Sequence, residues 1–139
     1  MTATEIKSVQ DTFMKVLSIS DTAATIFYDR LFELDPSTKA LFSNMAKQKK
    51  ILMDTLKTVV YSLHEFDTIR PAVRDLGKRH VKYQVQEHHY SIVGQALLFA
   101  LEKGLGSDFT PDVKQAWVSA YTHISSVMKE AAREVAPAK

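Results

Sequence analysis

The chain has 139 residues, of which 45% are hydrophobic and 24% charged, with a formal net charge of +2. This length fits one domain, and the balanced charge does not favour a nucleic-acid-binding protein, which needs a clustered basic face. The absence of cysteine excludes disulfides and thiolate metal sites. No apolar run reaches the roughly 18 residues of a membrane span, and the N-terminus lacks the apolar core of a signal peptide, so we expect a cytoplasmic protein without membrane contact.

Helical periodicity extends along almost the whole chain. Only four glycines and four prolines are present, so the residues that punctuate strands and hairpins are scarce. Apolar residues recur at helical spacing between capping residues, which predicts seven helices. In chain order these are expected at about residues 4–17, 21–34, 35–42, 47–63, 71–80, 87–106 and 110–135.

Capping residues and prolines set the expected boundaries. Thr4 is the expected N-cap of the first helix. Pro36, Pro71 and Pro111 are each placed at a helix start, where the missing N–H costs nothing. We therefore predict an all-α single domain over residues 1–139, with its core at about 5–130 and a frayed tail at about 133–139.

Three polar residues fall on apolar helix faces. His80 continues the stripe of Ile69, Val73 and Leu76. Such a histidine can complement the helix macrodipole or bind a metal, and its spacing alone favours the first interpretation. The sequence also leaves two interpretations for Tyr28 and Gln48. Tyr28 can be an ordinary core tyrosine and Gln48 an ordinary residue of a helix start, or both can belong to a functional site.

The other histidines give no metal-binding pattern. His88 and His89 are adjacent, so on a helix we expect them to diverge and not to chelate one metal. His64 and His123 have no second histidine at helical spacing. The sequence also lacks a zinc motif, a P-loop and a nucleophile elbow, so the common catalytic motifs do not account for a function.

Five short motifs occur in a characteristic order. They are FYDRLF at 27–32, DPSTKALF at 35–42, RH at 79–80, HYSIVGQALL at 89–98 and AWVSAY at 116–121. With this order and spacing, the chain resembles the globins from about residue 5 to 130, especially bacterial single-domain haemoglobins and the globin domain of flavohaemoglobins. The resemblance implies a three-over-three sandwich of helices A, B, C, E, F, G and H around haem b.

The resemblance also implies residue roles. His80 would be the proximal ligand of the haem iron. Tyr28 and Gln48 would be the distal polar residues, and Tyr90 would be the helix G tyrosine behind His80. The residues that would line the haem are Phe42, Leu52, Leu56, Val85, Val93 and Leu97.

These roles imply a protein that binds O₂, NO, CO or other diatomic gases. A hydrogen bond from Tyr28 would slow O₂ release by roughly ten- to hundredfold. With a separate reductase, the protein would act as an NO dioxygenase that detoxifies NO; the alternatives are O₂ storage or delivery and gas or redox sensing. The glutamate that flavohaemoglobins place behind the helix G tyrosine is replaced by Ala132, so we expect a less electron-donating His80. We expect a monomer or weak dimer.

Overall fold

The computed structural model describes residues 1–82 and 85–135, and every regular element in these ranges is helical. In chain order the elements, with η for a 3₁₀ helix, are α1 (Ala3–Leu17), α2 (Ser20–Leu34), η1 (Pro36–Leu41), α3 (Met45–Tyr61), η2 (Leu63–Glu65), α4 (Phe66–Lys82), α5 (Glu87–Leu105), η3 (Gly106–Asp108) and α6 (Pro111–Val135). The all-α prediction is confirmed. Among the described residues, no helix combines the length and the apolar character that crossing a membrane requires.

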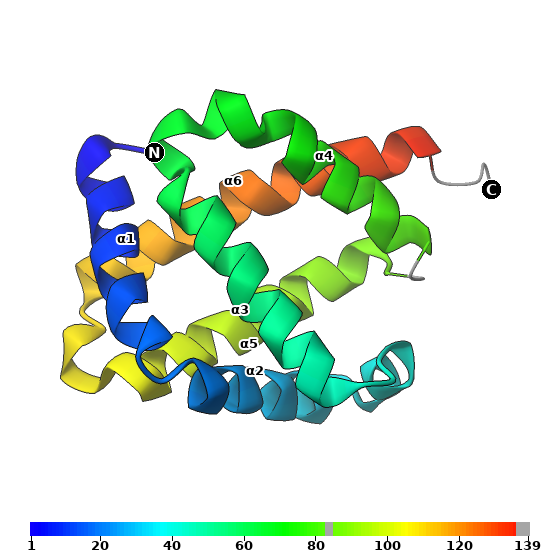
Figure 1. Cartoon of the computed structure of the whole chain (residues 1–139), viewed down its shortest axis with the longest axis horizontal. Helices are drawn as coiled ribbons and strands as arrows, with labels where there is room; N and C mark the ends of the chain where they lie inside the picture. The colour runs from blue at the N-terminus through cyan, green and yellow to red at the C-terminus, as the bar shows by residue number, and fades with distance from the viewer. Residues whose placement is uncertain (83–84, 136–139) are drawn as a thin grey trace.

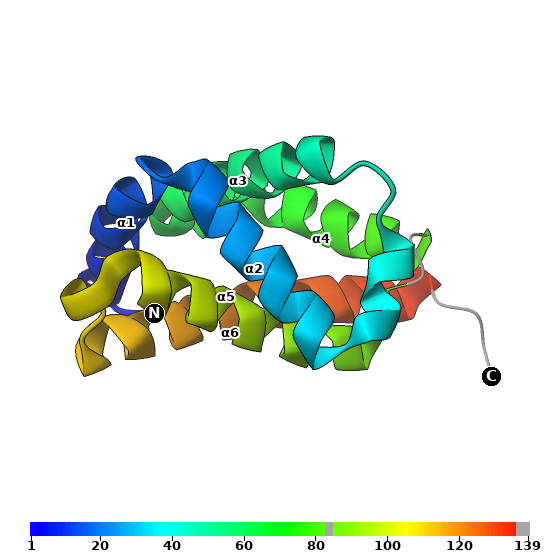
Figure 2. The same ribbon diagram turned by 90° about the horizontal axis from the view of Figure 1, so that it is seen from below.

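The helices form two crossing layers. Helices α3 and α4 lie on one side and α5 and α6 on the other, and α2 crosses obliquely past α5 (Figure 2). The most extensive pairings are α4 with α6, α2 with α5, and α1 with α6. In Figure 1 the two layers cross at a steep angle, with α3 running in front of α5. This arrangement brings α2, α3, α4 and α5, which carry the polar residues of interest, around one interior.

Gly77 allows α4 to lie directly on the backbone of α6. A β-carbon at Gly77 would lie 2.3 Å from the carbonyl oxygen of Met128. No side chain can be accommodated at that distance unless the two helices separate. His80 follows within one helical turn of Gly77, so this contact determines where His80 is held.

Trp117 joins α6 to α1 in the core. Its side chain is 2% exposed, and its indole N–H donates to the Thr12 hydroxyl at 2.9 Å. The Phe13 ring packs on it at a centroid distance of 6.0 Å. A buried indole usually needs such an acceptor, so Thr12 allows the large apolar surface of Trp117 to be buried without leaving its N–H unpaired.

The predicted start of the first helix is wrong by two residues. Thr2 is the N-cap of α1, because its side chain accepts the Glu5 N–H while the Glu5 side chain accepts the Thr2 N–H. This reciprocal capping box satisfies two backbone donors, whereas Thr4 lies inside the helix. At the other end of the chain, α6 continues to Val135, so the first residues of the expected tail are helical, and residues 136–139 lie outside the described ranges.

The predicted role of Pro71 is also wrong. Helix α4 begins at Phe66, so Pro71 lies inside the helix, where it cannot donate a backbone hydrogen bond. Phe66 is buried and packs against the His123 ring of α6, with centroids 4.3 Å apart. This tertiary packing holds the first turn of α4 in place despite the lost hydrogen bond.

Candidate functional site

Tyr28 is a buried polar side chain surrounded by aromatic rings. It lies in α2 and is 4% exposed. The Phe42 ring meets it edge-on at a centroid distance of 5.3 Å, and the Phe32 ring lies at 6.0 Å. Burial raises the pKa of Tyr28 to about 12, and hydrogen bonding with the Gln48 side chain opposes the rise. The phenol is therefore protonated at neutral pH and can act as a donor.

Two capped turns bring Phe42 and Gln48 to Tyr28. The Asp35 side chain caps η1, and Phe42 follows directly as the C-cap of this short helix. The Asn44 side chain caps α3 by accepting the Lys47 N–H, and the Asn44 backbone carbonyl accepts the Gln48 N–H at 2.9 Å. Gln48 consequently stands in the first turn of α3, where its partly buried side chain reaches Tyr28.

An apolar cavity of about 20 Å³ lies between α1, α2, α3 and α5. Leu52, Leu56 and Leu97, three of the predicted haem-pocket residues, line it together with Phe27. The Phe27 ring touches Tyr28 at a centroid distance of 4.9 Å. A cavity without polar partners holds water poorly, so this space is suited to a small apolar molecule.

His80 has the hydrogen-bonding arrangement of a metal-binding histidine. It lies near the end of α4, and its Nδ1–H donates to the Leu76 carbonyl at 2.7 Å. This bond fixes the tautomer with the lone pair on Nε2. Burial lowers the pKa of His80, the bond to Leu76 opposes this, and the Arg79 charge lowers it further. A lowered pKa favours the neutral imidazole that a metal requires.

Val85, just before α5, and Tyr90, in its first turns, follow His80 closely in the chain. The Val85 N–H donates to the His80 carbonyl at 3.0 Å. Tyr90 is 7% exposed, and its hydroxyl is buried with no hydrogen-bond partner among the described residues. Burial raises the pKa of Tyr90, and the Glu87 charge raises it further. Ala132, at the position where a glutamate was expected, is partly buried and has no side-chain acceptor to offer.

Tyr121 is a candidate site residue that the sequence analysis did not identify. Its hydroxyl donates to the Tyr90 carbonyl at 2.5 Å. Gly94 makes room for the ring, because a β-carbon there would lie 2.8 Å from the Tyr121 ring. Burial raises the pKa of Tyr121, so the hydroxyl remains a donor. Tyr121 lies four residues after Trp117 and therefore on the same helix face. This spacing was the signal in the sequence that could have identified Tyr121 as an inward-facing residue.

The predicted site residues occupy four helices and two of the segments that connect elements. Tyr28 comes from α2, Phe42 follows η1, and His80 lies in α4. The others are Gln48, Leu52 and Leu56 in α3, Val85 before α5, and Tyr90, Val93 and Leu97 in α5. Val93 is partly buried, as are Leu52, Leu56 and Val85. The structure brings Tyr28, Phe42 and Gln48 into one group, and it places Leu52, Leu56 and Leu97 around the cavity.

This set of side chains fits a haem group. A single neutral histidine with its lone pair on Nε2 supplies the kind of axial ligand that haem iron takes. Phe42 and the leucines of the cavity offer apolar surface for a porphyrin, and Tyr28 offers one donor in apolar surroundings. The Tyr90 hydroxyl, which has no partner within residues 1–82 and 85–135, is the type of group that a bound molecule or water completes.

Comparison with known proteins identifies the family. The globin family profile matches residues 25–128. The flavohemoprotein of Bacillus subtilis is 31% identical over 120 residues, which are 84% of this chain and 30% of that protein. Neuroglobin of Danio rerio is 29% identical over 118 residues, which are 74% of each chain. An engineered carbene transferase from Rhodothermus marinus, whose parent is a proposed nitric oxide dioxygenase, matches with a TM-score of 0.88 and 24% identity over 97% of this chain and 95% of that one.

The helical sandwich and the family match together define a haem-protein class. The chain belongs to the globin family, and its fold is the predicted globin fold. Membership implies haem binding and a small gas as ligand. The chain spans about 30% of the length of the Bacillus subtilis flavohemoprotein, so the activity of that whole protein does not transfer to it directly.

Proposed function

We propose that this globin binds haem b through His80 Nε2 and holds O₂ or another diatomic gas beside Tyr28. When bound, the haem would supply the iron that takes the gas. The observation that carries this proposal is the buried Tyr28 hydroxyl among aromatic rings, close enough to Gln48 for that side chain to oppose the rise in its pKa that burial causes. Buried polar pairs of this kind in an apolar pocket are typical of ligand sites.

The chain's own residues would favour a polarised gas over water. Tyr28 donates a hydrogen bond in a medium of low dielectric constant, where such a bond is stronger than in water. Gln48, whose side chain opposes the rise in the pKa of Tyr28 on burial, would be a second donor to the gas. The neighbouring apolar cavity, lined by Leu52, Leu56 and Leu97, offers nothing that retains water. These features predict slow O₂ release.

NO detoxification is the enzymatic form of this proposal. One NO, one O₂ and one electron combine to give one nitrate ion, and a reductase partner supplies the electron. Similarity to flavohemoproteins supports this candidate. The test is to mix the O₂-bound protein rapidly with NO and count nitrate. Repeated turnover with a reductase would support an NO dioxygenase, whereas a single slow turnover would contradict it.

O₂ storage or delivery is the second candidate, and the proximal side favours it. The Tyr90 hydroxyl lacks a partner among the described residues, and Ala132 cannot supply a carboxylate there. Without that anion, the His80 imidazole receives less electron density from behind, because the groups around a metal ligand tune its basicity. A weakly donating histidine suits reversible binding better than oxygen activation.

Haem binding is tested with the purified protein and added haemin. We expect an intense Soret band that His80→Ala abolishes or shifts and that added imidazole restores. His64→Ala is the matched control, because His64 is an exposed histidine paired with Glu65 on the surface. A protein that remains colourless with haemin, or a spectrum that His80→Ala leaves unchanged, would refute the proposal.

A further inference from the structure

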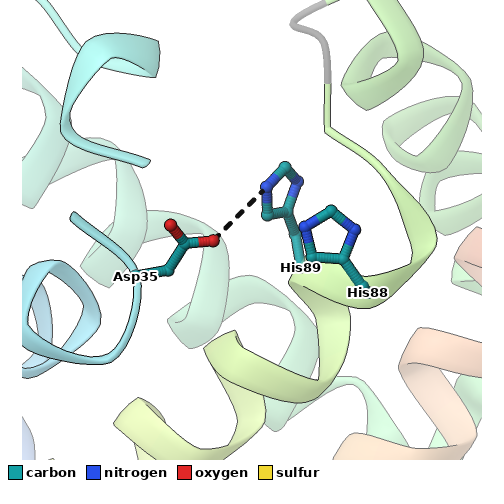
Figure 3. A group of neighbouring side chains, drawn as sticks. All are labelled: Asp35, His88 and His89. Carbon is teal, nitrogen blue, oxygen red and sulfur yellow. Dashed lines mark ion pairs between the residues drawn. The ribbon is translucent and has the colours of Figure 1, made fainter. Parts of the chain in front are cut away.

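Asp35, His88 and His89 form a cluster of metal-ligating side chains apart from His80. Asp35 lies between α2 and η1, and both histidines lie in the first turn of α5. One ligand atom from each residue lies within 4.8 Å of the other two. In Figure 3 the two imidazoles stand side by side, and the carboxylate points toward His89.

The predicted divergence of His88 and His89 is wrong. Their ring centroids are 4.1 Å apart, with an interplanar angle of 47°. Helical side chains lean toward the N-terminus, and in the first turn no preceding turn lies beneath them. Both rings can therefore extend past the end of α5 into the same space, although their α-carbons project in different directions.

We propose that Asp35, His88 and His89 form a binding site for a borderline divalent cation, with Zn²⁺ as the best match. Two imidazoles and one carboxylate are a common protein ligand set for zinc. Three protein ligands leave at least one coordination position for water. None of its residues is placed in the gas pocket, although Asp35 also caps η1, the short helix that leads to Phe42.

The cluster combines a fixed carboxylate with an accessible imidazole. Asp35 Oδ1 accepts the Ser37 N–H at 3.0 Å, while Oδ2 lies 4.0 Å from His89 Nε2. Hydrogen bonds from Ser37 lower the pKa of Asp35, so the carboxylate is ionised at neutral pH. Its negative charge offsets the positive end of the α5 dipole, which would otherwise oppose a cation. His88 is exposed and can turn toward the ion.

Metal binding requires one rearrangement at His89. The Gln86 N–H donates to His89 Nδ1 at 2.9 Å, so the neutral ring carries its proton on Nε2. A cation at Nε2 shifts this proton to Nδ1 and opens the bond from Gln86. Losing one capping bond weakens binding by about fivefold. This fivefold loss of affinity is smaller than the roughly 10- to 100-fold gain in metal affinity that even a group supporting a metal ligand contributes.

The experiment is a calorimetric Zn²⁺ titration of the haem-loaded protein. We expect one zinc ion per chain in addition to the iron. His88→Ala and Asp35→Asn should each weaken the affinity for zinc by about tenfold or more. His64→Ala removes an exposed histidine elsewhere and should leave the zinc affinity unchanged. Asp35→Asn keeps a side-chain oxygen for the Ser37 N–H, and an unchanged Soret band shows that the fold is retained.

A second measurement follows the predicted rearrangement. In the ¹H–¹⁵N spectrum, zinc should move the Gln86 amide resonance of the native protein and leave it in place in His88→Ala. The proposal is overturned if no zinc binds, if the cluster variants bind zinc as tightly as the native chain, or if His64→Ala weakens binding equally.

Discussion

Replacing Tyr28 with phenylalanine removes one hydroxyl from an otherwise preserved aromatic group. The ring can keep its edge-on packing with Phe42, 5.3 Å away, because both side chains have the same shape apart from the oxygen. A hydrogen bond to a polarised gas in a buried site contributes about 1–3 kcal/mol. Its loss should therefore accelerate O₂ release by roughly ten- to hundredfold.

The O₂ off-rate is measured by stopped-flow displacement of O₂ from the ferrous protein with excess CO. Tyr61→Phe is the matched control, because it removes the same hydroxyl from a partly buried tyrosine that packs on Phe13 instead of Phe42. It should release O₂ at the native rate. Gln48→Leu should accelerate release to a smaller extent, since Tyr28 remains as a donor. An unchanged off-rate in Tyr28→Phe, with an unchanged thermal melting curve, would refute a donor role for this hydroxyl.

Three further changes test the scaffold. Gly77→Ala should lower the free energy of unfolding in urea by about 1–3 kcal/mol, because α4 and α6 must separate. Gly104→Ala is the control and should cost little, since its new methyl group meets only a flexible side-chain tip. Equal effects of the two substitutions would contradict the close-contact argument. Tyr121→Phe should cost about 0.5–1.5 kcal/mol through the lost bond to the Tyr90 carbonyl, measured by thermal unfolding; an unchanged melting temperature would show that water replaces the donor. The pKa of Tyr28 is raised to about 12 in the fold, so as pH rises the Tyr28 phenol loses its proton in the unfolded chain before it does in the folded one. The free energy of unfolding should therefore fall by on the order of 2 kcal/mol as pH rises from 10 through 12. Urea unfolding of Tyr28→Phe should show a smaller fall over the same range.

The sequence contains enough information to predict the helices, because their signals are local. The apolar stripe leading to His80 recurs every three or four residues, and such periodicity needs only a single chain segment to be recognised. Asp35 with Pro36, and Thr110 with Pro111, mark helix starts by local capping chemistry, and the structure begins η1 and α6 there. The order of the five motifs then indicated the globin family correctly.

Other features depend on contacts between distant segments. Pro71 is retained inside α4 because Phe66 packs on α6, which no local rule reveals. The meeting of His88 and His89 depends on the space beyond the end of α5. The bond from Tyr121 to the Tyr90 carbonyl spans 31 residues. The ligand roles of His80, Tyr28 and Gln48 stay predictions until a gas-binding measurement tests them.

The buried indole described in the core also gives the protein an internal optical probe. Trp117 is the only tryptophan in the chain, so its fluorescence comes from one known position. Because its N–H is bonded to Thr12 and its ring packs on Phe13, its emission reports the docking of α1 on α6. Separation of these helices would expose the indole to water and shift the emission to longer wavelength. A folding experiment can thus follow assembly of the scaffold by fluorescence and haem uptake by absorbance in the same sample, and so determine which occurs first.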